Sequence, residues 1–198
     1  MGPILTGLVL FGVLPGPLAG CTPQGMAVGI VAKAATMAME ERGFVGAVDD
    51  GAIDLAINGK LFETNEKLFR QVNVTVREGR VLLTGSVPRT DHRIEAVRLA
   101  WEVEGVREVL SELTAEDTSD LVDYARDVWL TNKLETTLLF DSDVQAINYS
   151  IDVVNGTLFI MGIGQDSAER NRVLAYAREM PHVRRIVDYT RLKTDPRM

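Results

Sequence analysis

The sequence has few of the residues on which most catalytic and metal sites depend. It contains one cysteine and two histidines, and it shows no Ser-His-Asp arrangement, zinc-ligand spacing or P-loop. A single cysteine also excludes an internal disulfide bond. Acidic residues outnumber basic ones, and the net charge of −7 excludes a general nucleic-acid binder, because that function requires many phosphates to be neutralised. We therefore expect no catalysis, no cofactor or metal, and no nucleic-acid partner.

The first twenty residues have no charge and end at the cysteine. Glycine and proline residues between 12 and 17 interrupt this apolar run, so it falls short of the roughly 20 good helix formers that a membrane-spanning helix needs. The tetrapeptide LAGC (18–21) resembles the lipobox of bacterial lipoprotein signal peptides. The resemblance implies that residues 1–20 are removed and that Cys21 is acylated, with palmitate as an expected acyl chain. No Lys or Arg precedes the run, which leaves open a start codon upstream of Met1.

Residues 21–49 are predicted to form a lipidated N-terminal tether. In enteric bacteria an aspartate directly after the acylated cysteine is an inner-membrane retention signal. Thr22, Pro23 and Gln24 follow Cys21, so this signal is absent. We therefore expect the mature protein on the periplasmic face of the outer membrane. The Ala- and Met-rich composition predicts a short helix over 28–41, followed by an extended stretch because "RGF" (42–44) introduces a break. Alternatively, this helix packs on the first domain or on the bilayer.

The remainder of the chain is an internal repeat. Shifting it by 77 residues without a gap places Gly79 on Gly156 and Gly85 on Gly162, and the apolar positions also match. This register indicates two duplicated domains, predicted at 50–117 and 118–194. A glycine within a strand, as expected at 85 and 162, predicts a bulge or a close approach by the neighbouring helix.

Hydrophobic periodicity gives both repeats the same order of elements. The first repeat is predicted to contain a helix at 51–62, strands at 72–76 and 81–87, a helix at 90–105 capped by Thr90 or Asp91, and a strand at 107–113. In the second repeat, Asn155-Gly156 is a strong hairpin-turn signal. The predicted fold class is α+β, with two α-β-β-α-β units, each a three-stranded mixed sheet covered by two helices.

This pattern resembles the BON domain. The segments "VTVREGRVLLTGSV" and "EGVREV" match its V.V..G.V.L.G.V and GV..V motifs, and two such domains behind a lipobox resemble the dual-BON outer-membrane lipoproteins of proteobacteria. The resemblance spans about Asp50 to Lys193. It implies a periplasmic, outer-membrane-anchored lipoprotein that concentrates at division sites. Such a protein would bind anionic phospholipid through the first helix of the second BON domain and support envelope integrity.

The first helix of the second repeat carries a tryptophan outside its predicted core stripe. Leu130, Leu134 and Leu138 define that stripe, and a band about 100° to 160° away contains an aromatic–lysine combination suited to a membrane interface. In the first repeat the same band holds small or acidic residues, among them Ala52, Ala56 and Glu63. The predicted lipid-binding residues are Val122, Trp129, Lys133, Thr136 and Phe140.

Four further points bear on this prediction. Trp129 and Phe140 could instead fill a seam between the two BON domains. The acidic residues Asp123, Asp127 and Glu135 depart from the basic character that the family tends to show in this helix. Finally, the BON pair could be an envelope scaffold that binds a protein partner, such as an outer-membrane assembly or cell-wall factor. The basic segment 166–198 would either assist binding to an anionic bilayer or form a salt-bridged surface.

Overall fold

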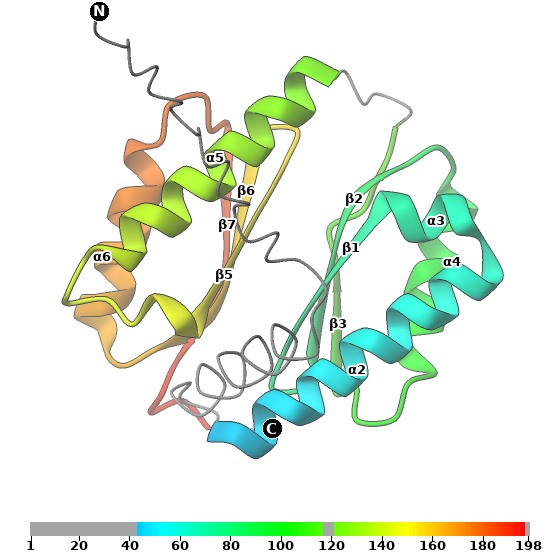
Figure 1. The fold of residues 1–198 in the computed structure, drawn as a ribbon, viewed down its shortest axis with the longest axis horizontal. Coiled ribbons are helices and arrows are strands. Elements are labelled where there is room, and N and C mark those ends of the chain that lie inside the picture. Colours follow the sequence, from blue (N-terminus) through cyan, green and yellow to red (C-terminus); the bar gives the residue numbers. More distant parts are fainter. Residues whose placement is uncertain (1–42, 117–120, 197–198) are drawn as a thin grey trace, which may run out of the picture. The chain divides into compact units, whose positions relative to one another are not determined.

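The computed structural model describes residues 43–116 and 121–196, which include both predicted repeats except residues 117–120 (Figure 1). The first repeat contains α2 (Gly43–Thr64), α3 (Glu66–Gln71), β1 (Val72–Arg77), β2 (Arg80–Val87), α4 (Thr90–Trp101), β3 (Glu108–Ser111) and β4 (Thr114–Ala115). The second contains α5 (Leu121–Leu139), the 3₁₀ helix η1 (Ala146–Asn148), β5 (Tyr149–Val154), β6 (Thr157–Gly164), α6 (Ser167–Glu179) and β7 (Arg185–Leu192). The predicted signal peptide, Cys21 and the predicted helix at 28–41 lie outside the described residues.

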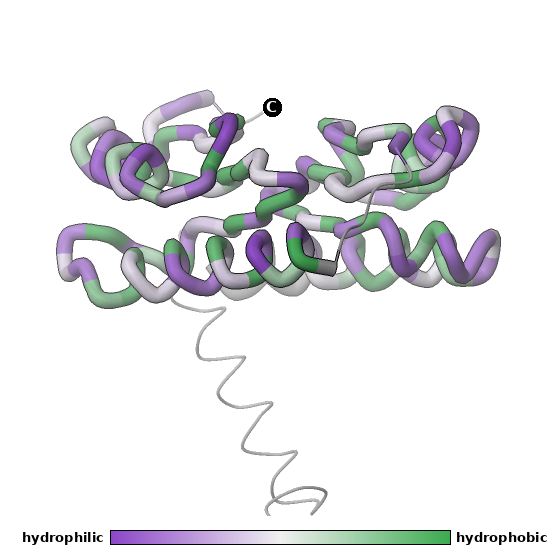
Figure 2. The backbone as a smooth tube through the Cα atoms, turned by 90° about the horizontal axis from the view of Figure 1, so that it is seen from above, coloured by the Kyte–Doolittle hydropathy of each residue, from purple (hydrophilic) through white to green (hydrophobic). Residues whose placement is uncertain are grey.

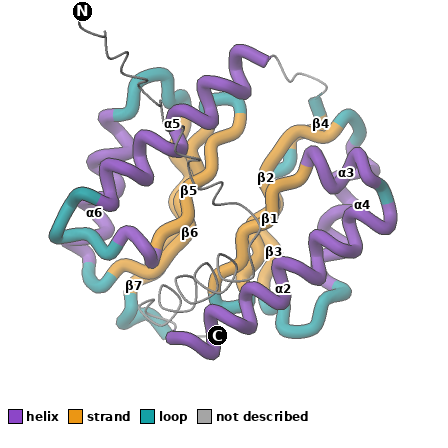
Figure 3. Tube along the Cα trace, viewed as in Figure 1, coloured by secondary structure: helices purple, strands orange, loops and turns teal. Residues whose placement is uncertain are grey.

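Each repeat forms a mixed sheet with its hairpin on one side and its last strand on the other. The strand orders are β1-β2-β3 and β5-β6-β7, with short β4 pairing with the end of β2. The hairpin strands are antiparallel, whereas β3 and β7 run parallel to β2 and β6. The helices of each repeat lie on one side of its strands (Figure 3). The predicted α-β-β-α-β order is confirmed in both repeats, and the first repeat adds α3 and β4, so its sheet has four strands where three were predicted.

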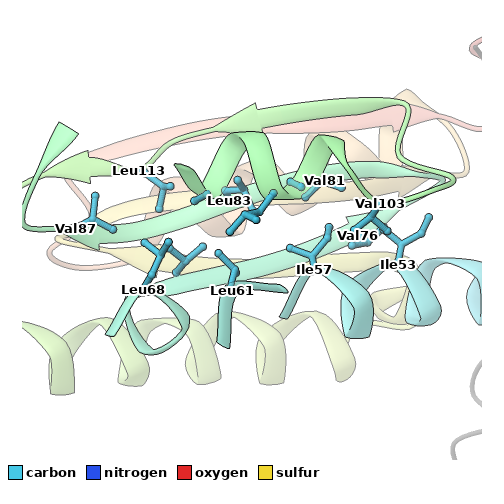
Figure 4. Close-up of a cluster of buried hydrophobic side chains, with 14 residues drawn as sticks. Ile53, Ile57, Leu61, Leu68, Val76, Val81, Leu83, Val87, Val103 and Leu113 are labelled. Carbon is cyan, nitrogen blue, oxygen red and sulfur yellow. The ribbon is translucent and has the colours of Figure 1, made fainter. Parts of the chain in front are cut away.

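One face of each sheet packs against the buried stripe of the first helix. In the first repeat, Ile53, Ile57 and Leu61 point from α2 toward side chains of the strands (Figure 4). In the second, Leu130, Leu134 and Leu138 are at most 1% exposed, which confirms the predicted stripe. Full burial of each such side chain contributes about 1.5–3 kcal/mol. Hydrophobic and hydrophilic residues alternate along the helical coils, as this one-sided packing requires (Figure 2).

Both hairpins turn through two residues with left-handed backbone. The φ angles are 54° and 72° at Glu78 and Gly79, and 49° and 70° at Asn155 and Gly156. Consecutive positive φ values are typical of the type I′ turn, whose twist matches that of the flanking strands. The predicted turn at Asn155-Gly156 is confirmed.

A buried aspartate from the first helix holds each turn in place. Asp50 in α2 accepts hydrogen bonds from the two turn amides of the first hairpin, at 2.7 and 2.8 Å. Asp127 in α5 accepts the equivalent bonds in the second hairpin, at 2.6 and 3.0 Å. The two aspartates occupy equivalent positions in the 77-residue repeat. We name this contact between helix and turn the aspartate clamp.

Removing the clamp should destabilise the first repeat. We expect Asp50→Ala to lower the free energy of unfolding by about 3 kcal/mol, because two turn amides lose a charged acceptor. Its neighbour Asp49 is exposed, so Asp49→Ala should change stability by less than about 0.5 kcal/mol. Urea denaturation of the two variants measures the difference. Equal losses from both would show that the clamp adds nothing beyond ordinary surface contacts.

The sheet faces that the helices leave uncovered pack against each other. Leu82 of β2 and Phe159 and Met161 of β6 are at most 3% exposed and form a third cluster, separate from the two helix-covered cores. We call this cluster the seam, together with the partly buried residues packed on it, which are Leu110, Val154, Val187 and Tyr189. Both repeats belong to one compact unit. Because each sheet is covered on both faces, β2 and β6 are buried along almost their whole length.

Polar groups connect the two sheets around the seam. Arg77 donates to the Ser150 hydroxyl at 2.7 Å, and Arg80 donates to the Tyr189 carbonyl at 3.1 Å. The Tyr189 hydroxyl donates to Glu112 at 2.5 Å. Burial and this hydrogen bond raise the pKa of Tyr189 to about 12. These contacts satisfy polar groups that the seam would otherwise bury without partners.

The structure corrects two predictions about helix starts. The stretch after "RGF" is not extended, because α2 already begins at Gly43 and runs unbroken into the predicted helix. Extending an existing helix costs little, since each added residue gains one backbone hydrogen bond. The N-cap of α4 is Arg89, not Thr90 or Asp91, and it makes no side-chain capping bond. The Asp91 carboxylate is instead paired with the Arg89 guanidinium at 2.7 Å.

The two strand glycines also differ in part from their prediction. The expected close approach is present, but the neighbour is the backbone beside the paired strand rather than a helix. A Cβ at Gly85 would lie 2.1 Å from the Gln71 carbonyl oxygen, and one at Gly162 would lie 2.4 Å from that of Asn148. Each glycine pairs with the first residue of the preceding strand, where the chain leaves a helical turn. The predicted last strand at 107–113 is also shorter, since β3 ends at Ser111.

Candidate functional site

The outer surface of α5 exposes several large apolar side chains. Val122 is 62% exposed, Trp129 48% and Phe140 84%, while the opposite stripe of the same helix is buried. Neither Trp129 nor Phe140 belongs to the seam cluster. Thr136 and Lys133 are exposed as well. All five predicted lipid-binding residues therefore lie at the surface.

The structure brings Trp129 and Lys133 into direct contact. The Lys133 ammonium lies 4.7 Å from the centre of the Trp129 ring, within the range of a cation–π interaction. The two residues are four positions apart, so they are neighbours on the helix surface. Val122 and Phe140 lie at opposite ends of the helix, roughly 27 Å apart by the helical rise. The site is therefore a Trp–Lys pair with apolar residues toward both ends of α5, not a single cluster.

The lipid-binding band predicted from the sequence does not include three other exposed apolar residues of α5. Tyr124, Val128 and Leu139 are 65%, 42% and 71% exposed. They lie on the other flank of the outer surface, where the predicted band did not extend. A count of every apolar residue outside the core stripe would have found them. The apolar surface of α5 is accordingly broader than predicted.

The acidic residues of α5 do not share the surface of the Trp–Lys pair. Asp127 is only 7% exposed and is occupied by the aspartate clamp. Asp123 pairs with Arg126. Glu135 is exposed, and partial desolvation and repulsion by Asp152 raise the pKa of its carboxyl. The exposed surface of α5 is therefore less acidic than its sequence suggests.

Four basic residues of the C-terminal segment form ion pairs, among them Arg191 with Glu108. Arg170 pairs with Asp188 at 2.7 Å, and Arg172 pairs with Asp143 at 3.0 Å. Arg185 pairs with Glu112 at 3.1 Å, across the two repeats. These contacts favour the salt-bridged surface over a free basic patch.

The acidic residues that follow α5 make local contacts. Asp141 accepts a hydrogen bond from the Tyr176 hydroxyl at 2.7 Å, which lowers the pKa of that carboxyl. Among the residues that the structure describes, no group of His, Cys, Asp and Glu could hold a metal ion. Within the same ranges, no helix has the length and hydrophobicity to cross a membrane.

Comparison with known proteins identifies the repeats. The BON domain family model matches residues 49–117 and 126–194. The chain is 35% identical over 147 residues to an "uncharacterized protein in gshII 5'region" of Anaplasma centrale, covering 74% of this chain and 96% of that protein. It is 29% identical over 185 residues to the "outer membrane lipoprotein DolP" of Haemophilus influenzae, covering 93% and 91%.

A further relative is the "osmotically-inducible protein Y" of Escherichia coli, which is 25% identical over 141 residues and covers 70% of both chains. The two matched ranges coincide with the two α-β-β-α-β units, and each includes the hairpin and the last strand of its sheet. The chain therefore belongs to the BON domain family and contains two tandem BON domains.

Proposed function

We propose that this protein is a lipoprotein of the outer membrane that contacts anionic phospholipid through α5 of its second BON domain. One observation carries the proposal: an exposed tryptophan with a lysine ammonium over its ring, where the first BON domain has Ala52 and Ala56. A tryptophan ring is favourable at headgroup depth in a bilayer, and an ammonium beside it can meet phosphate.

Attachment to the outer membrane through an acylated Cys21 is supported by separate observations. The relative named outer membrane lipoprotein DolP aligns over 93% of this chain, and LAGC (18–21) resembles a lipobox. An acylated Cys21 would hold the protein on the periplasmic face of the outer membrane. Contact by α5 would then orient a protein already held at the bilayer, because shallow interfacial binding is weak and reversible by itself. A role in envelope integrity is part of the same proposal.

Vesicle binding by the chain without residues 1–21 tests the lipid contact, since this chain keeps every described residue. Trp129→Glu should abolish binding to vesicles that contain phosphatidylglycerol, because it puts a carboxylate among phosphates. The fold should persist, because the side chain is exposed. Lys133→Glu should weaken binding mainly to anionic vesicles, and added salt should have the same effect by screening.

The second tryptophan provides a matched control. Trp101 on α4 is 52% exposed, so Trp101→Glu makes the same change at an equally exposed site and should leave binding intact. In a Trp101→Phe background, Trp129 is the only tryptophan, and its emission should shift to the blue with anionic vesicles. An unchanged emission, or equal losses from the two glutamate variants, would reject α5 as the lipid contact and favour the protein-binding scaffold.

A further inference from the structure

The first BON domain contains an open surface cavity of about 680 Å³ along the middle of α2. Such a volume lies within the range of about 300–1,000 Å³ that is typical of ligand sites. One side of α2, the β1–β2 turn and the loop between α4 and β3 form its walls. Its apolar lining consists of Ala52, Ile53, Ala56, Gly79, Val103 and Gly105.

The second BON domain has large side chains at the equivalent place. The 77-residue shift places Ala52 on Trp129 and Ala56 on Lys133. The wall residue Ile53 corresponds to Leu130, which is buried in the same way. The cavity in the first domain therefore lies where the second domain carries its Trp–Lys pair. Because Ala52 and Ala56 are small, the space that Trp129 and Lys133 would occupy is open in the first domain.

The cavity is also more acidic than its counterpart. Five acidic and two basic residues line it, and Lys60, one of the basic pair, is bound to Glu102 at 3.1 Å. Three of the acids are Asp49, Glu78 and Glu104. None of these three is acidic in the second domain, where the shift finds arginine, asparagine and proline. An apolar wall with an acidic rim suits an aromatic ring that carries a neighbouring cation.

We propose that this cavity binds the Trp129–Lys133 face of a second copy of the chain. That face presents the required chemistry, since its ring and ammonium are 4.7 Å apart and both side chains are exposed. The contact joins two different surfaces, so it is heterologous and can link chains head to tail. The same face is proposed to contact lipid, so a second copy and a bilayer would compete for it, and a test without lipid measures the contact between copies alone.

The test uses the chain without residues 1–21 in sedimentation velocity over a concentration series. The parent should show concentration-dependent association. Ala52→Trp fills the cavity with the residue that the second domain has there, and Trp129→Ala removes the inserted group. Each variant alone should associate at least tenfold more weakly than the parent. Asp49→Arg, at an exposed rim position, should also weaken association and avoids any change in the interior.

Mixing the two defective variants gives the decisive result. The Trp129→Ala chain keeps an open cavity, and the Ala52→Trp chain keeps an intact Trp129. A heterologous contact therefore predicts that the mixture forms a one-to-one complex, although neither variant associates alone. A parent that stays monomeric at its solubility limit would overturn the proposal, as would a mixture that stays monomeric. Thermal melting of each variant shows that a loss of association is not a loss of fold.

Discussion

Replacing Gly85 by alanine should lower the free energy of unfolding by about 3 kcal/mol or more. Two costs combine at this position. The backbone has φ of 127°, where a side chain is strained, and the new Cβ would lie 2.1 Å from the Gln71 carbonyl oxygen. That oxygen is part of the backbone and cannot rotate away. For a protein of this size the loss corresponds to a decrease in melting temperature of roughly 6–12 °C.

Alanine substitutions at two other glycines provide stability changes with which the Gly85→Ala loss can be compared. Gly162 lacks the positive φ but has the close carbonyl, so Gly162→Ala should cost less than Gly85→Ala. Gly59 is an exposed helical residue with open space around its Cα, and Gly59→Ala should raise stability by up to about 1 kcal/mol. Calorimetry of the three variants gives the order. Melting of Gly85→Ala within a degree of the parent would contradict the strained packing at this strand.

The second large effect concerns the seam. Met161 is fully buried on the sheet face that meets the first domain, away from α5 and α6. Met161→Lys would place an ammonium between the two sheets, at a cost of several kcal/mol. Because the helix-covered cores stay intact, we expect the two BON domains to separate before they unfold. Small-angle X-ray scattering should then show a larger radius of gyration, and the melting curve should broaden.

Met161→Leu is the matched control for this experiment. It keeps the volume and the apolar character of the side chain, and it should cost less than about 1.5 kcal/mol. Its scattering profile should equal that of the parent. If Met161→Lys also kept the parent's radius of gyration and melting temperature, the two sheets would not pack on each other in solution.

The helix-covered half of the fold could be predicted from the sequence because its signals are local. Leu130, Leu134 and Leu138 recur at helical spacing, and Asn155-Gly156 marks a two-residue turn. Because the pattern recurs after 77 residues, each helix and strand is predicted from two separate segments of the chain. The clamp was not predicted, because Asp50 and Asp127 look like ordinary surface acids until the turn amides are placed beside them.

The seam was only partly visible in the sequence. The run "TLFIMGI" (157–163) has apolar residues at successive positions, which indicates a strand covered on both faces. What covers the second face depends on pairings such as Arg77 with Ser150, which join residues far apart in the chain. The exposure of Trp129 also needed the structure, because a tryptophan on the outer side of a helix is compatible with an interdomain contact as well as with solvent.

The seam joins equivalent residues of the two repeats. Leu82 and Phe159 are equivalent residues of the two repeats, and both belong to the seam cluster. Equivalent residues meet in this way at the axis of a homodimer. If the two repeats were separate chains, their pairing through this sheet face would depend on protein concentration. Joining the two copies in one chain makes the pairing intramolecular, at an effective concentration on the order of millimolar. Joining the repeats thereby removes the dependence of this pairing on protein concentration, and it lets α5 carry Trp129 while the equivalent helix, α2, keeps small residues beside an open cavity.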